Sequence, residues 1–254
     1  MSHAGQLGFI AACVDANREL VHGASVLEVG SYDVNGSVRR LFAAADRYLG
    51  VDLVQGPGVD VVVAGKDYNS SDGSFDVTLS GECFEHDEDW RETFAAMVRL
   101  TRPGGLVVFT CASRGRIEHG TRRTTASESP GTQALGSDYY RNVLPIEVAA
   151  LPLEAWFEES AMHFAPGPAD LYFCGIRAGE CGVKLGGRLP DPSAVRDLAR
   201  LVPSRMRIVQ APARLLSRVV SDQRRFQDLA TRYWAAILKG AQLMKRAPGR
   251  GPSR

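Results

Sequence analysis

The chain has 254 residues, of which 44% are hydrophobic and 23% are charged, a composition typical of a soluble globular protein. No run of about 18 apolar residues is present, which excludes a membrane-spanning helix, and residues 1–20 lack the basic flank and apolar core of a secretory signal. Five scattered cysteines, never spaced C-x-x-C, argue against a disulfide framework or a zinc cluster. We therefore expect reduced thiols, a cytoplasmic protein and no metal site.

The hydrophobic pattern of the first 112 residues predicts alternating strands and helices. In chain order we expect a helix at 6–21, a strand at 25–29, a helix at 37–45, strands at 47–53, 59–65 and 75–80, a helix at 88–101, and, after the stop RPGG, a strand at 106–112. This alternation is typical of a parallel, doubly wound sheet with helices on both faces.

The second half begins with a long polar stretch, residues 113–142, of the kind that is either functional or disordered. We then expect a helix at 152–160 and strands at 161–165 and 170–178. Because only PGPA separates these strands, they must pair antiparallel.

The net charge of +1 conceals two regions of opposite sign. Residues 1–180 contain 14 Lys and Arg against 25 Asp and Glu, whereas residues 181–254 contain 16 against 4. We expect a domain over 1–180 and a basic helical extension over 181–254 with a disordered tail. The extension should hold a helix at 191–202, capped by Asp191, and another at 221–246. The second helix has an apolar stripe of Phe226, Leu229, Tyr233, Ile237 and Met244.

The loop after the first strand, in VLEVGSYDVNG (26–36), is a candidate ligand site. Gly30 and Gly36 would let the backbone approach a ligand, but the central glycine of G-x-G-x-x-G is missing and Asp33 would repel a phosphate. The loop therefore fits a phosphate-free adenosine such as S-adenosylmethionine better than a pyrophosphate. A purely structural tight turn is the alternative interpretation.

Two acidic residues support this ligand. Glu28 could lie near the ammonium group of S-adenosylmethionine, and Asp52, just past the second strand, could accept hydrogen bonds from both ribose hydroxyls. An NAD enzyme would use such an acid in the same way, so Asp52 does not discriminate between the two cofactors.

Over residues 25–179 these features resemble the class I S-adenosylmethionine-dependent methyltransferases, with a type 11-like methyltransferase domain. The resemblance rests on VLEVGSYDVNG, YLGVDL, GKDYNSSDGSFDVTLSGECFEH and LTRPGGLVVF, in that order. It implies an α/β, Rossmann-like, doubly wound seven-stranded sheet with an antiparallel terminal hairpin, here followed by a C-terminal helical extension. The departures are a longer first loop, with Tyr32 where a glycine is common, and VQGPG in place of the second helix.

Together with the two acids, the resemblance implies a set of residues that bind S-adenosylmethionine. It places Leu53 next to the adenine and matches Asp67, followed by Tyr68, to the adenine-binding acid. The complete set is Glu28, Gly30, Ser31, Gly36, Asp52, Leu53, Asp67, Tyr68 and Ser80.

The methyl acceptor should lie beyond the same strand ends, near Ser80, Glu82, His86 and the stretch 113–142. His119 and the DYYR of residues 138–141 resemble a methyltransferase subgroup associated with saccharide and cell-envelope pathways, in which this stretch covers the acceptor pocket. We predict that His119, His86 and Tyr139 face the acceptor and that a histidine could act as general base. Two structural interpretations stay open: Glu85-His86 as a wall of the cofactor pocket, and the tyrosines as anchors of a surface loop.

We therefore expect O-methylation of a small-molecule or saccharide acceptor. The alternatives are an RNA methyltransferase that uses the basic extension, a non-catalytic scaffold of the same fold, and an NAD enzyme. The extension itself could dock on the acidic domain or on a second subunit of a homodimer, or contact an anionic membrane surface peripherally. Nucleic acid is a weaker candidate partner because no RNA-binding motif is present.

Overall fold

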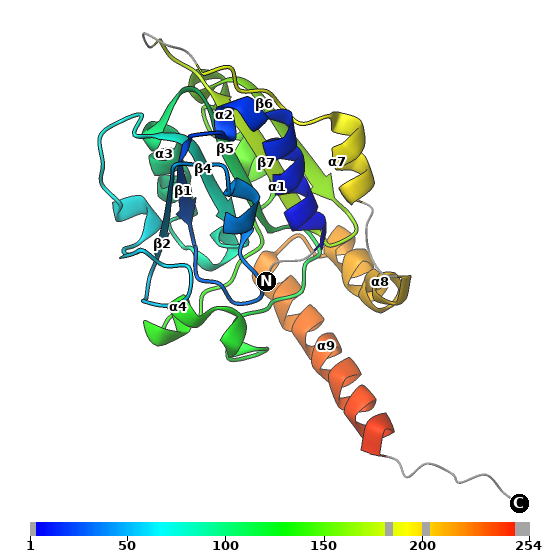
Figure 1. The fold of residues 1–254 in the computed structure, drawn as a ribbon. Coiled ribbons are helices and arrows are strands. Elements are labelled where there is room, and N and C mark those ends of the chain that lie inside the picture. Colours follow the sequence, from blue (N-terminus) through cyan, green and yellow to red (C-terminus); the bar gives the residue numbers. More distant parts are fainter. Residues whose placement is uncertain (1–3, 181–184, 200–203, 247–254) are drawn as a thin grey trace, which may run out of the picture.

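The computed structural model describes residues 4–180, 185–199 and 204–246, and its strands form one mixed sheet (Figure 1). The strands are β1 (Ser25–Val29), β2 (Arg47–Asp52), β3 (Val61–Val62), β4 (Phe75–Gly81), β5 (Thr101–Ala112), β6 (Phe157–Ala165) and β7 (Asp170–Arg177). Their order is β3-β2-β1-β4-β5-β7-β6, parallel from β3 to β5 and antiparallel from β5 through β7 to β6. The expected Rossmann-like fold with its terminal hairpin is confirmed.

Each face of the sheet is covered by helices that bury an apolar core. On one face lie α1 (Ala4–Ala16), α2 (Arg18–Val21) and α7 (Pro192–Ala199), with Phe9 stacked on Tyr172 at 4.9 Å between ring centroids. On the other face lies α3 (Trp90–Leu100), whose Phe94 packs edge-on against Phe109 and Phe173. Burial on both faces explains the continuous apolar runs of β4 and β5.

The expected helix at 6–21 is interrupted at Asn17 for a reason that the sequence pattern does not show. The side-chain amide of Asn17 donates to the carbonyl oxygens of Cys13 and Arg188, and its oxygen accepts the Arg188 N–H at 2.7 Å. Asparagine commonly competes with helical backbone hydrogen bonds in this way. The break ties the residues before α7 to the first helix.

Several other expected boundaries were wrong. Residues 37–45 form a short 3-10 helix, η1 (Val38–Phe42), and the strand expected at 59–65 shrinks to β3. RPGG does not separate a helix from a strand, because β5 begins at Thr101 and contains it. The helix expected at 152–160 ends early as α6 (Leu153–Trp156), since the ring of Phe157 packs against Phe173 at the start of β6.

Some elements were not anticipated. They are α4 (Pro130–Ala134), α5 (Pro145–Ala149), α8 (Ser204–Val219) and the single 3-10 turns η2 (Gly65–Asp67), η3 (Phe84–His86) and η4 (Ala126–Glu128). Of the helices that the structure describes, none is long and apolar enough to cross a membrane.

The C-terminal helices α8 and α9 (Gln223–Arg246) pack beside the stretch that follows β5. Phe226 is buried with Ala213 and Ala230 against Ile117, whereas the rest of α9 projects away from the sheet (Figure 1). The expected apolar stripe is therefore only partly correct, because Leu229 and Ile237 are exposed. The side chain of Met244 lies outside the described part of the helix.

Candidate active site

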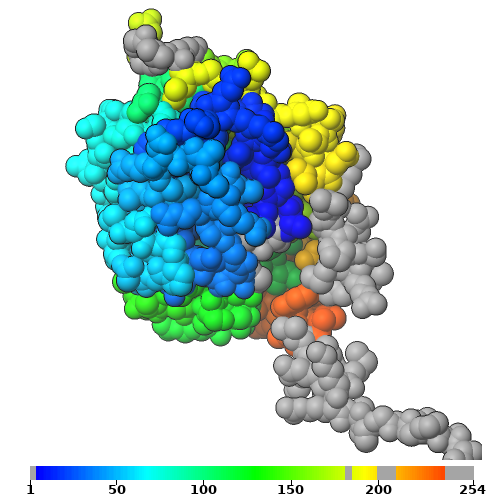
Figure 2. All heavy atoms as spheres, in the orientation of Figure 1, coloured from blue at the N-terminus to red at the C-terminus, as the bar shows by residue number. Residues whose placement is uncertain are grey.

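A cavity of about 270 Å³ opens at the carboxyl ends of β1, β2 and β4. It lies where β1 is flanked by β2 on one side and β4 on the other, which is where open α/β sheets bind ligands. Its walls come from residues 28–38, 51–53, 63–66, 81–83, 86–89 and 128–132, with Gln6 and Ser137. In the space-filling view, the green surface after β5 lies against the blue and cyan loops after β1 and β2 (Figure 2).

The loop after β1 is shaped by its own glycines and by Asp33. Gly30 has a φ of +77°, and a Cβ there would lie 2.6 Å from the Cβ of Cys83, so a larger residue would clash. The Asp33 carboxylate accepts the Gly36 N–H at 2.6 Å, which closes a tight turn. Asp33 therefore stabilises the loop.

Glu28, at the end of β1, lines the cavity and is buried, with 6% of its surface exposed. It accepts a hydrogen bond from the Tyr48 hydroxyl at 2.7 Å. Burial raises the pKa of Glu28 to about 8, because desolvation outweighs that hydrogen bond. A cationic ligand group beside this carboxyl would favour its ionised form.

Asp52 and Leu53 also line the cavity, at the end of β2. The Asp52 carboxylate accepts the N–H groups of Tyr32 at 3.0 Å and Leu53 at 2.7 Å, while burial raises its pKa. A carboxylate has about four acceptor positions, so two further donors can bind it. Two acids thus stand on either side of the β1 loop.

The two serines expected at the cofactor lie differently. Ser31 is buried in the loop beside Gly50 and lines the cavity. Ser80 is fully buried in β4 and is not part of the wall.

The structure does not bring Asp67 or Tyr68 to the cavity. Asp67 is exposed at the end of η2, and the Tyr68 ring packs near Phe75 at 6.2 Å between centroids. The wall is formed by Ala64 and Gly65 instead. These two small residues after β3 were not predicted from the sequence to line the cavity.

Three rings form a cluster at the part of the cavity wall that contains His86. His86 lines the wall, and its ring lies edge-on to His119 at 5.2 Å and to Tyr140 at 5.3 Å between centroids. Burial lowers the pKa of His86 to about 4 and that of His119 well below its usual value, so both rings are neutral near pH 7.

The predicted Tyr139 does not belong to this cluster. It is half-exposed and outside the cavity wall, whereas its neighbour Tyr140 packs against His119 at 5.0 Å. Successive side chains of an extended segment point in opposite directions, so the sequence alone could not select between the two tyrosines.

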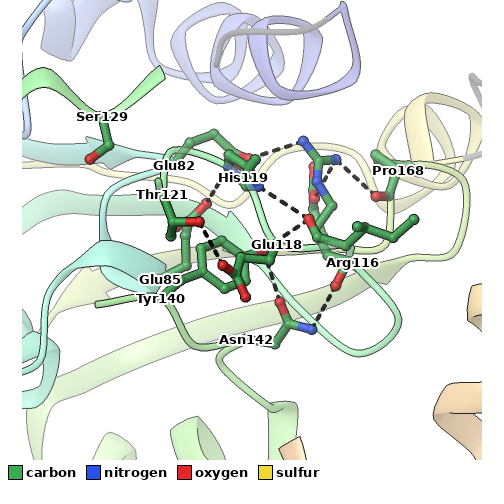
Figure 3. A network of polar contacts seen from close by, with 12 residues as sticks. Glu82, Glu85, Arg116, Glu118, His119, Thr121, Ser129, Tyr140, Asn142 and Pro168 are labelled. Atoms are coloured by element: carbon green, nitrogen blue, oxygen red, sulfur yellow. Dashed lines mark hydrogen bonds and ion pairs between the residues drawn. The ribbon is translucent and has the colours of Figure 1, made fainter. Parts of the chain in front are cut away.

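Beside the rings lies a buried charge network (Figure 3). The Arg116 guanidinium donates to Asp170 at 3.2 Å and to the Pro168 carbonyl oxygen at 2.9 Å, and it lies 3.9 Å from Glu82. Glu85 is fully buried, with one carboxylate oxygen 3.6 Å from Nε2 of His119. Arg116 and Asp170 are not predicted site residues, since an arginine in a polar stretch carries no signal of burial.

The C-terminal helices hold the stretch that carries His119. The Gln227 side chain accepts the Glu118 N–H at 2.9 Å and donates to the Arg116 carbonyl oxygen at 3.0 Å. Nearby, Arg123 pairs with Asp228 at 2.9 Å. The start of α9 thus docks directly on the acceptor side of the candidate site.

Comparison with known proteins identifies one family. Residues 27–109, from β1 to β5, match the model of a family described as a methyltransferase domain, which confirms the resemblance expected from the sequence motifs. No curated protein matches the chain.

Many solved structures are similar to this chain. Examples are the Burkholderia thailandensis 1,6-didemethyltoxoflavin-N1-methyltransferase (18% identity, 68% of this chain and 80% of that chain, TM-score 0.47), the Bacillus subtilis YcgJ protein (12%, 70% and 100%, 0.49) and the N-methyltransferase NodS of Bradyrhizobium japonicum WM9 (15%, 68% and 84%, 0.44).

Proposed function

We propose that the chain, whose residues 27–109 match a methyltransferase domain, uses S-adenosylmethionine to methylate an oxygen of a small, hydroxyl-rich acceptor. The observation that carries this proposal is the pair Glu28 and Asp52 across the β1 loop in one cavity. A cavity with two acids and no glycine-rich phosphate loop suits a cationic, phosphate-free nucleoside.

The residues of the wall suggest a role for each part of the cofactor. Glu28 faces the ammonium group, and the amides of the loop from Gly30 to Gly36 face the carboxylate. The two free acceptor positions of Asp52 take the ribose hydroxyls. Leu53 and the small residues Ala64 and Gly65 contact the adenine, in place of Asp67 and Tyr68.

Methyl transfer itself needs little from the protein besides positioning. Bound S-adenosylmethionine would supply an activated methyl group to the acceptor oxygen, whose hydroxyl proton would pass to solvent. His86 on the wall can help to position the acceptor oxygen. Its low pKa makes it a weak general base, which favours this orienting role.

The chemistry of the acceptor side supports a hydroxyl-rich substrate. The wall there includes Glu82, His86, Ser129 and Thr132, which offer several hydrogen-bonding groups. A saccharide has the matching pattern of hydroxyl groups.

We also propose a division of roles along the chain. Residues 1–180 bind the cofactor and the acceptor, and residues 181–254 form an extension that holds the acceptor stretch in place. The hydrogen bonds of Gln227 to the main chain of Arg116 and Glu118 support this division.

Calorimetry and a methyl-transfer assay test the proposal. The wild-type protein should bind S-adenosylhomocysteine and transfer a radiolabelled methyl group from S-adenosylmethionine to members of a panel of saccharides and phenols. Asp52→Asn should weaken the binding, whereas Asp46→Asn, an acid outside the cavity, should not. If NAD binds and S-adenosylhomocysteine does not, the assignment is wrong.

A further inference from the structure

Two Glu-His dipeptides, Glu85-His86 and Glu118-His119, meet next to the cavity. Glu85 and His86 form part of η3, directly after β4, and His119 belongs to the stretch after β5. One oxygen of Glu85 and one ring nitrogen from each histidine all lie within 4.8 Å of one another. Of these three residues, only His86 has a role in the proposed methyl transfer.

Polar side-chain atoms of this cluster are buried and have no hydrogen-bond partner in another described residue. Neither carboxylate oxygen of Glu85 bonds to another residue, and neither does Nδ1 of His86 or Nε2 of His119. The 3.6 Å between Glu85 and Nε2 of His119 is too long for a hydrogen bond. Buried polar atoms without partners are costly, so this cluster points to a ligand that satisfies all three side chains at once.

The outer nitrogens of the two rings are oriented for such a ligand. Nδ1 of His119 lies 3.4 Å from the Ile117 carbonyl oxygen, which leaves the lone pair on Nε2. The His86 ring lies edge-on to the His119 ring at 5.2 Å between centroids, and its Nδ1 has no hydrogen-bond partner among the described residues. Histidines that bind metals usually donate their second ring N–H to a carbonyl or carboxylate in this way.

The charge balance also favours a cation. The buried Arg116 is engaged by Asp170 at 3.2 Å, with Glu82 at 3.9 Å, and no ion pair joins it to Glu85. Among the described residues, the only ion-pair contact of the Glu85 carboxyl is with His119, at 3.6 Å.

From this geometry we propose that Glu85, His86 and His119 bind one divalent transition-metal ion. Two imidazoles and one carboxylate are a known ligand set for Zn²⁺, and the same set can hold Fe²⁺ or Mn²⁺. Ligand atoms bound to one tetrahedral ion at about 2.1 Å lie about 3.4 Å apart, so side-chain movements of roughly an ångström would close the site. The edge-on contacts of Tyr140 with both histidine rings hold them in place.

The position of the site connects it to the reaction. His86 also lines the cavity, so an ion bound to it would lie at the acceptor side, with an open coordination position for an acceptor oxygen. The binding of an acceptor oxygen by the ion rests on the proposed function, whereas metal binding itself does not. This site also departs from the expectation of no metal, which considered cysteine spacing and missed the two Glu-His pairs.

Metal content and Co²⁺ absorption test the proposal directly. The protein is stripped with a chelator and titrated with Zn²⁺ by calorimetry, and Co²⁺ is added to report nitrogen and oxygen ligation through its visible bands. We expect one ion per wild-type chain. His86→Asn, His119→Asn and Glu85→Gln should each lower the affinity at least about 10-fold.

The matched control is His163→Asn, which removes a histidine on β6 outside the cluster and should bind the ion like wild type. Circular dichroism establishes that each variant is folded, and S-adenosylhomocysteine binding is measured on the same samples. The proposal is overturned if the folded wild type binds neither ion at micromolar concentration, or if the three variants bind as well as the control. Cofactor binding retained in those samples would show that the proposed function stands without the metal.

Discussion

Gly131 of α4 lies directly over the Asp52 carboxylate: a Cβ at Gly131 would be 2.8 Å from Oδ1 of Asp52 and 3.4 Å from the Cβ of Leu53. The stretch that covers the acceptor side therefore also touches the residue expected to bind the ribose. The stretch after β5 and the end of β2 are therefore in contact at this point.

Gly131→Ala should therefore weaken S-adenosylhomocysteine binding, by roughly 10-fold for a displacement that costs about 1.4 kcal/mol. The alanine would push α4 or Asp52 aside, although alanine is otherwise the better helix former. Calorimetry measures the effect. Gly186→Ala is the matched control, because a Cβ there meets no atom within 4 Å. Equal losses in both variants would contradict the proposed contact.

Glu28→Gln should stabilise the cofactor-free protein at high pH and weaken cofactor binding. Burial raises the pKa of Glu28 from 4.5 to about 8, so the folded state holds this proton more tightly than the unfolded state does. Ionising Glu28 thus lowers stability progressively as pH rises from about 4.5 to about 8, and glutamine removes that loss.

Melting temperatures of the two proteins without cofactor check this sign. They should agree near pH 4, and the variant should melt increasingly higher up to about pH 8. A difference that is constant with pH would show that Glu28 does not titrate as its burial requires.

Gln227→Leu should loosen the acceptor stretch without affecting the cofactor. The variant loses two buried hydrogen bonds to main-chain atoms of Arg116 and Glu118, each worth about 1 kcal/mol. Hydrogen exchange at residues 116–124 should accelerate and methyl transfer should fall, while S-adenosylhomocysteine affinity stays the same.

Asp228→Asn is the comparison for this variant. Its ion pair with Arg123 is about half exposed, and such pairs contribute less than about 1 kcal/mol. If the Asp228 variant has the larger effect, the buried Gln227 is not what holds the stretch.

Replacing each of the two adjacent tyrosines should change the stability of the protein to a different extent. The Tyr140 hydroxyl donates to Asn142 at 3.1 Å from a position beside both histidines, whereas Tyr139 is half-exposed. Tyr140→Phe should lower the free energy of unfolding by about 1 kcal/mol and Tyr139→Phe by close to nothing. Urea denaturation measures both, and a larger effect at Tyr139 would contradict the stabilising role assigned to the Tyr140 hydroxyl.

The fold could be predicted because its central strands are buried on both faces and leave a strong apolar signal. The short turn PGPA forced the antiparallel hairpin of β6 and β7, and Gly30, Glu28 and Asp52 follow their strands closely enough to be placed at the sheet edge. These features depend on local sequence.

What could not be predicted depends on contacts between distant segments. The helix break at Asn17 exists because Arg188 returns to it, and the burial of Arg116 requires Asp170 from another strand. The choice between Asp67 and the Ala64–Gly65 pair depends on how the chain turns after β3. No local sequence pattern indicates such contacts between distant segments.

The most direct test of the account is calorimetric titration of the folded protein with S-adenosylhomocysteine, for the wild type and for Asp52→Asn. The account predicts binding by the wild type and a loss of about 10- to 100-fold in the variant, because hydrogen bonds to a charged group contribute about 1.5–3 kcal/mol. Absence of binding by the wild type at millimolar ligand, or identical affinities for the two proteins, would contradict it.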